Sequence, residues 1–277
     1  MILRIRNGLR NQKTVLVCSV ILSLFFLVTL LAPWISPHDP IQVNLALKLQ
    51  PPSWDYPLGT DQLGRCNLSR LLHGARISLG FASLIFVSSL GIGLLVGTFS
   101  GLKGGLVDAV LMRFCEGVMA FPNLVLIIGI VGILGPGLMQ VVLALMLVQW
   151  VYYAHMFRGM VLSLKERNFI AAARISGSSQ WQIIRRHIIP NVLPPIIVMG
   201  TLEIGWAIMD ISALSFLGLG IQPPAPEWGA MIHDGKAYIR SNPELMIYPG
   251  MLILIVVVSF NLLGEALSDR LNVKRRY

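Results

Sequence analysis

Residues 169–191, FIAAARISGSSQWQIIRRHIIPN, form a short basic segment between two of the most apolar stretches of the chain. Helix-forming residues precede Gly177, and Ser178 and Ser179 after it are possible N-caps of a second short helix. We expect Pro190 to end that second helix. The segment therefore predicts a polar, positively charged helical hairpin, and its role depends on the solvent around the rest of the chain.

The composition indicates a membrane protein. Of the 277 residues, 55% are hydrophobic and 13% are charged, and the mean hydropathy is +0.72, whereas a soluble domain carries about 25% charged residues. The net charge of +9 could suggest nucleic acid. The basic residues, however, gather in three clusters, as loops on one side of a bilayer do, and predict no nucleic-acid partner. These clusters are Arg4, Arg6, Arg10 and Lys13; Lys165, Arg167, Arg174, Arg185 and Arg186; and Arg270, Lys274, Arg275 and Arg276.

Apolar runs predict an all-α integral membrane protein with six transmembrane helices. A hydrocarbon core of about 30 Å requires roughly 20 apolar residues in a helix. The stretches that satisfy this length are 14–34, 77–98, 108–133, 138–157, 192–217 and 246–266. We interpret the first as an uncleaved anchor, because its apolar run is too long for a signal peptide and no small-x-small cleavage site follows it.

The basic clusters also predict the orientation. Six spans return the chain to the side on which it began, and basic loops favour the cytoplasm. We therefore expect residues 1–13, the loop 158–190 and the tail 267–277 to be cytoplasmic. Residues 35–76 and 218–245 are expected outside.

The order of residues in the opening segment favours a docking role over a plain basic loop that binds anionic lipid headgroups. The segment resembles the coupling loop of the inner-membrane permeases of ATP-binding-cassette importers. That loop reads Glu-Ala-Ala, three residues, Gly, then nine residues before an apolar-x-apolar-Pro ending. The corresponding positions here are Ala171, Ala172, Ala173, Gly177, Ile189 and Pro190. Ala171 stands where the glutamate is usual, which removes the basis for a specific ion pair there.

The resemblance implies a type I importer permease fold, with a core over residues 77–266 and a coupling loop at about 159–190. Small alanines would let the first short helix lie flat against its neighbour, and Gly177 would permit the turn. The exposed helix would insert into a groove on a cytoplasmic ATPase, so that closure of the ATPase moves the membrane helices as a rigid body.

Three further motifs are similar to the dipeptide, oligopeptide and nickel permeases, specifically to the second permease of each pair. They are PLGTDQLGRCNLSRLLHGARISLG at 57–80, LSFLGLGIQPPAPEWGAMI at 214–232 and YPGMLILIVVVSFNLLGEALSDRLN at 248–272. In the first of them Cys66 replaces a usual aspartate. The resemblance implies a bacterial inner-membrane location and, besides membrane lipid, three kinds of partner: a second homologous permease, two cytoplasmic ATPases and an extracytoplasmic solute-binding protein.

The fold of such a permease does not decide its cargo. Residues 149–158, 201–210 and 227–239, together with the missing loop glutamate, look more like the nickel branch than the peptide branch. We therefore expect nickel or another transition metal, free or as a chelate. A dipeptide or an oligopeptide is the alternative.

Glu116, Glu203 and Asp210 lie inside predicted spans, where each would cost about 2.5 kcal/mol or more in lipid. They are therefore expected to face a partner subunit or a wet pathway. Glu203 and Asp210 lie two helical turns apart and share one helix face. They could line a route for a cationic cargo, or they could hydrogen-bond across the permease pair.

The sequence predicts no catalytic residue, no metal ligand and no cofactor bound by this chain. It has no phosphate-binding loop of the Gly-x-x-x-x-Gly-Lys-Ser/Thr kind, so ATP is expected to be hydrolysed by separate ATPase subunits. His155 and His233 are interpreted as structural. A stand-alone channel or secondary carrier is the competing class, and the coupling-loop pattern argues against it.

Overall fold

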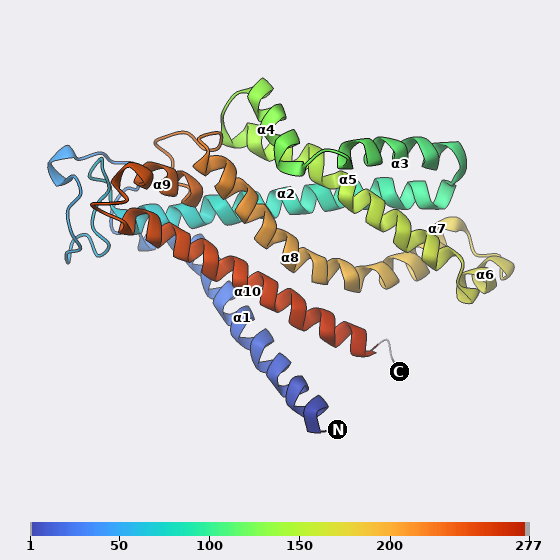
Figure 1. Ribbon diagram of the computed structural model, residues 1–277. Helices are drawn as coiled ribbons and strands as arrows, with labels where there is room; N and C mark the ends of the chain where they lie inside the picture. Colours follow the sequence, from blue (N-terminus) through green and yellow to red (C-terminus); the bar gives the residue numbers. More distant parts are fainter. Residues whose placement is uncertain (1, 275–277) are drawn as a thin grey trace.

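The computed structural model describes residues 2–274, and every regular element among them is a helix (Figure 1). Five helices are long and apolar enough to cross a membrane. These are α1 (Ile2–Ile35), α2 (Asn67–Lys103), α5 (Leu138–Lys165), α8 (Ile189–Phe216) and α10 (Glu244–Lys274). The all-α membrane fold is confirmed.

The third expected span, 108–133, is not one straight helix. Helix α3 (Gly105–Met119) and helix α4 (Asn123–Leu134) are bent by 89° at the break between them. Pro122 precedes α4, and a proline both lacks an N–H donor and disfavours helical backbone in the residue before it. The chain therefore has six candidate spans only if this bent pair counts as one.

Helices α2 and α5 form the most closely packed pair of the molecule, and small residues explain why. A Cβ added at Gly93 would lie 2.3 Å from Cβ of Tyr153, and one added at Gly97 would lie 2.3 Å from the carbonyl oxygen of Ala154. The two backbones approach closely only because these positions are glycine, as expected for packing in a membrane. Helices α8 and α10 complete the core beside this pair, and α1 packs on α10 and α2.

The second short helix does not end at Pro190, contrary to the sequence-based expectation. Helix α7 (Gln180–Ile183) continues through a π-helical turn, Ile184–Ile188, into α8. A π turn shifts the backbone hydrogen bonds by one residue and accommodates the missing N–H of the proline. The fifth span is therefore joined rigidly to the hairpin.

The polar parts gather at two opposite ends of the molecule. Both described chain ends and the hairpin of α6 (Asn168–Ile175) and α7 lie towards one end (Figure 1). Residues 36–66 lie at the other end with the short helix α9 (Trp228–Gly235). The 3₁₀ turns Leu45–Leu47 and Lys236–Tyr238 belong to this second end.

Candidate functional site

The hairpin that the sequence predicts as the coupling element, called the coupling hairpin below, consists of α6 (Asn168–Ile175), a tight turn and α7. Gly177 has a φ of +79°, the left-handed conformation that closes a helix. The Ser178 N–H donates to the Ala173 carbonyl at 3.0 Å, which is the long bond of a Schellman cap. Ser179 and Gln182 exchange backbone-to-side-chain bonds of 2.8 and 3.3 Å, a capping box for α7. The expected turn at Gly177 is therefore present and held by hydrogen bonds on both sides.

One face of the hairpin is packed on α5. Ile170, Ile183 and Ile188 are buried in a cluster with Phe157 and Val161 of that helix. The hairpin is therefore in close-packed contact with α5 and, through Ile188 and Val192, with the start of α8.

The alanines of the motif are placed differently from the expectation. Ala171 and Ala172 are exposed, and only Ala173 is partly buried against the α5 cluster. The helical period explains this arrangement, since Ile170 and Ala173 share the inner face of α6 and the two residues between them point outward. Ala171 and Ala172 therefore do not hold α6 against its neighbour.

The outer face of the hairpin combines exposed apolar and basic side chains. Ile175 is 88% exposed, Trp181 is 67% exposed, and Arg185 and Arg186 are exposed beside them. An exposed apolar patch with a polar border is typical of a protein or membrane contact.

An ion pair missed in the sequence joins the helices next to the hairpin. Arg158 of α5 donates from both Nε and Nη2 to the Asp108 carboxylate of α3, each at 2.6 Å. Ser100 of α2 donates to the same carboxylate at 2.5 Å. Lys165 of α5 donates to the Leu102 carbonyl at 3.0 Å, at the C-terminus of α2, where a cation is favourable. These contacts make the ends of α2, α3 and α5 one unit.

Glu203 and Asp210 of α8 both face α5, which confirms that they share a helix face. Gln149 donates to Asp210 at 3.1 Å, and the Tyr153 hydroxyl forms a hydrogen bond with Glu203. Within residues 2–274, both carboxylates are therefore bonded to neutral groups of the same chain. Both are only half-buried, and Trp206 between them is 56% exposed.

Glu116 does not join this pair. It lies on α3, is 50% exposed and pairs with Arg113 at 3.1 Å on the same helix. Its ionic partner is therefore on its own helix and not on α8. His233 Nδ1 lies 2.7 Å from the Phe216 carbonyl, and His155 is exposed. No cluster of three metal-ligating side chains occurs among the described residues.

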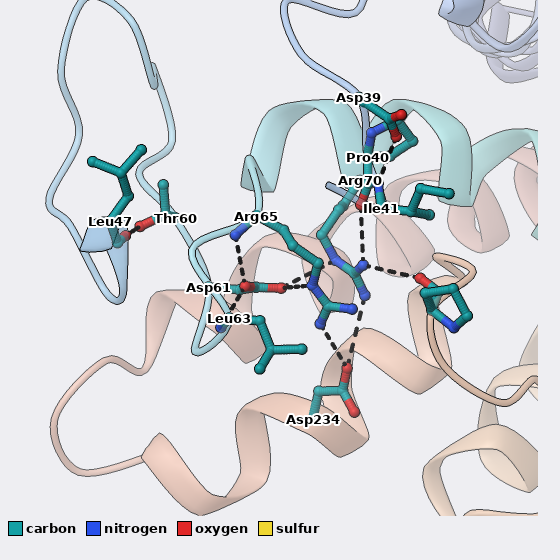
Figure 2. A network of polar contacts seen from close by, with 11 residues as sticks. Asp39, Pro40, Ile41, Leu47, Thr60, Asp61, Leu63, Arg65, Arg70 and Asp234 are labelled. Carbon is teal, nitrogen blue, oxygen red and sulfur yellow. Dashed lines mark hydrogen bonds and ion pairs between the residues drawn. The ribbon is translucent and has the colours of Figure 1, made fainter. Parts of the chain in front are cut away.

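A buried network of two arginines and two aspartates organises the opposite end. Figure 2 shows Arg65 and Arg70 between Asp61 and Asp234. Arg65 Nε donates to Asp61 at 2.6 Å, and Arg70 Nε lies 3.3 Å from the same carboxylate. Both arginines reach Asp234 of α9 at 3.4 and 3.7 Å. Residues 36–66 are thereby joined to α2 and α9.

Asp61 also organises its own loop, because it accepts the backbone N–H of Leu63 at 2.8 Å and that of Arg65 at 3.0 Å. Cys66, which stands in place of the usual aspartate, is buried at the start of α2 and makes no side-chain cap bond. The motif at 57–80 contains three members of the network, but no local pattern in the chain predicts that they meet Asp234.

Helix α9 is fixed to α2 at its N-terminus as well. The buried Glu227 carboxylate accepts the N–H groups of Gly229 and Ala230, each at 2.9 Å, and the Ser78 hydroxyl at 3.0 Å. The Trp228 indole donates to the Leu71 carbonyl at 3.1 Å. Helix α9 is therefore an integral part of the core.

Comparison with known proteins identifies the family. Residues 93–277 match the binding-protein-dependent transport system inner membrane component, and residues 4–52 match the N-terminal TM domain of oligopeptide transport permease C.

Two curated relatives are similar over nearly the full length. The nickel transport system permease protein NikC of Escherichia coli (strain K12) is 39% identical, with 95% of each chain covered. The probable D,D-dipeptide transport system permease protein DdpC of the same strain is 38% identical over 96% of this chain and 89% of that protein. Among solved structures, an inward facing MetNI methionine ABC transporter is similar in fold, with a TM-score of 0.56 and 21% identity over 72% of this chain and 94% of that chain.

Proposed function

Because the chain belongs to the family of binding-protein-dependent transport system inner membrane components, we propose that it forms half of the translocation pathway for nickel or another transition metal, free or chelated. The chain is a multi-pass inner-membrane permease subunit of an ATP-binding-cassette importer. It is not an enzyme, since ATP is hydrolysed by separate ATPase subunits.

The observation that carries the cargo proposal is the acidic pair on α8. Glu203 and Asp210 are held by Tyr153 and Gln149, which are neutral, so neither acid is paired with a basic side chain of the described residues. Such a negative lining in a region of low dielectric raises the local concentration of a cation. The name of the relative NikC supports nickel, and the similarly close DdpC makes a dipeptide the alternative cargo.

The coupling hairpin is proposed as the contact with the ATPase. Its exposed Ile175 and Trp181 supply the apolar surface, and its buried isoleucines pass the movement to α5 and α8. Ala171, Ala172, Ala173, Gly177, Ile189 and Pro190 are assigned to this coupling element. The proposal places both chain ends and the hairpin in the cytoplasm, and residues 36–66 outside, where a solute-binding protein docks. The complete importer would hold a second permease and two ATPases.

Replacing both acids, Glu203→Gln with Asp210→Asn, tests the cargo pathway. The amides keep the shape and the hydrogen-bonding capacity of the carboxylates but remove their charge. We expect nickel uptake by the assembled importer to fall about tenfold or more, since steering by charge contributes factors of about 10 to 1,000. Uptake is measured with radioactive nickel and, in parallel, with a neutral dipeptide.

The matched control is Glu116→Gln, which neutralises an acid of α3 that pairs with Arg113 on the same helix. This variant is expected to transport nickel as the unaltered protein does. Two outcomes contradict the proposal: unchanged nickel uptake by the double variant, or loss of the second permease from its purified complex. The second outcome would mean that the acids hold the two permeases together.

A further inference from the structure

A groove of about 570 Å³ runs along the outer surface of α2, at the end that carries residues 36–66. His73 and Arg76 line one part of it, and Ile77, Phe81 and Leu84 line the rest. The groove is thus basic at one end and apolar along the remainder.

The position of the groove relative to a bilayer follows from the sequence of α2. Residues 77–102 contain no charged side chain, whereas Arg76 directly precedes them and Lys103 directly follows them. Such a stretch is long enough to cross the hydrocarbon core. Arg76 therefore lies at the boundary between headgroups and acyl chains, with His73 one turn further out. Phe81 and Leu84 lie at acyl-chain depth.

The positive charge at this boundary is available to a ligand. Arg76 is exposed and makes no hydrogen bond or ion pair with any residue between 2 and 274. Arg70, nearly two turns earlier on α2, is by contrast saturated by Asp61 and Asp234. Asp39 interacts electrostatically with His73. Its carboxylate accepts the Ile41 N–H, and the residue lines a neighbouring hollow rather than the groove.

The walls and the floor of the groove are defined by the fold. Two crossing loops border it, at Pro40 and at Ala225. Arg70 holds both of these loops, because its Nη1 donates to the carbonyls of Pro40 and Pro224, each at 3.3 Å. Gly80 lies in the groove and is exposed, and a Cβ added there would meet no atom within 4 Å. The groove is thus preformed and open at acyl-chain depth.

We propose that this groove binds one anionic phospholipid of the leaflet on the side of residues 36–66. The phosphate is held by Arg76 and His73, and one acyl chain lies over Gly80 between Ile77 and Phe81. An anionic headgroup supplies the partner that Arg76 lacks, whereas an apolar helix of a second permease would leave this charge unpaired. Basic pockets beside transmembrane helices recognise anionic headgroups in this way.

The test is a lipid titration of the purified, fully assembled importer, read by native mass spectrometry. The probes are dioleoyl phosphatidylglycerol, which is anionic, and dioleoyl phosphatidylcholine, which is neutral overall. Arg76→Gln is expected to weaken binding of the most tightly bound phosphatidylglycerol molecule about fivefold. This factor corresponds to about 1 kcal/mol, the contribution of one basic residue near the membrane surface. Binding of phosphatidylcholine should not change.

Gly80→Leu places a side chain in the open floor and is expected to weaken binding of both lipids. Lys103→Gln is the control, because it removes one charge at the opposite end of the same uncharged stretch. The affinity of the tightest phosphatidylglycerol site should not change in this variant. Equal phosphatidylglycerol affinity in Arg76→Gln and the unaltered protein would overturn the proposal. So would efficient cross-linking of Leu84→Cys to the second permease, because a protein would then cover the groove.

Discussion

Gly177→Val is expected to reduce cargo transport by the assembled importer about tenfold or more while membrane insertion and assembly stay intact. Gly177 adopts a φ of +79°, which costs an L-residue roughly 1–2 kcal/mol and a β-branched residue more. A cost of about 1.4 kcal/mol shifts the population of the turn tenfold. Without the turn, the bond from Ser178 to Ala173 is lost, and the exposed Trp181 no longer has a fixed place relative to α6. The measurement is cargo uptake per ATP hydrolysed in proteoliposomes.

Gly177→Asn provides a matched control, because asparagine tolerates positive φ much better than valine. No atom lies within 4 Å of a Cβ at this position, so neither side chain is excluded by its size. The asparagine variant is therefore expected to keep most of the transport. If valine transports as well as asparagine, the hairpin is not the coupling element.

The largest loss of stability is expected from Asp61→Ala. The substitution leaves Arg65 and Arg70, which are nearly fully buried, without their closest carboxylate, and it removes the acceptor of two backbone N–H groups. Breaking a buried ion pair by removing one partner costs about 3–5 kcal/mol. We expect the apparent unfolding temperature of the purified importer to fall by roughly 10 °C.

Asp55→Ala is the control for that change, since Asp55 is an exposed acid of the same segment. Its unfolding temperature is expected to stay within about 1–2 °C of the unaltered value, as is usual for an exposed position. Equal unfolding temperatures for the two variants would show that the network of Figure 2 does not hold residues 36–66 to α2 and α9.

The sequence predicted those parts of the fold that depend on local pattern. Apolar length located the five long helices, and the left-handed turn at Gly177 followed from a glycine between two helix-forming runs. Similar reasoning placed Glu203 and Asp210 on one face, because helical spacing is fixed by geometry.

The parts that could not be predicted depend on contacts between distant residues. Asp108 and Arg158 lie 50 positions apart, and Arg65 and Asp234 lie 169 positions apart, so no local pattern pairs them. Pro190 was expected to end a helix, but a π turn and packing of Ile188 carry the helix past it. Pro122 was visible in the third span, yet the size of the bend depends on how α3 and α4 each pack on α5.

ATP-dependent accumulation of radioactive nickel in proteoliposomes tests the central claim most directly. The vesicles contain this chain, its second permease and the two ATPases, with the solute-binding protein added on the side of residues 36–66. We predict accumulation that requires ATP and stops when this chain or the ATPases are omitted. Accumulation by this chain without the ATPases would contradict the account, because the protein would then be a channel or a secondary carrier.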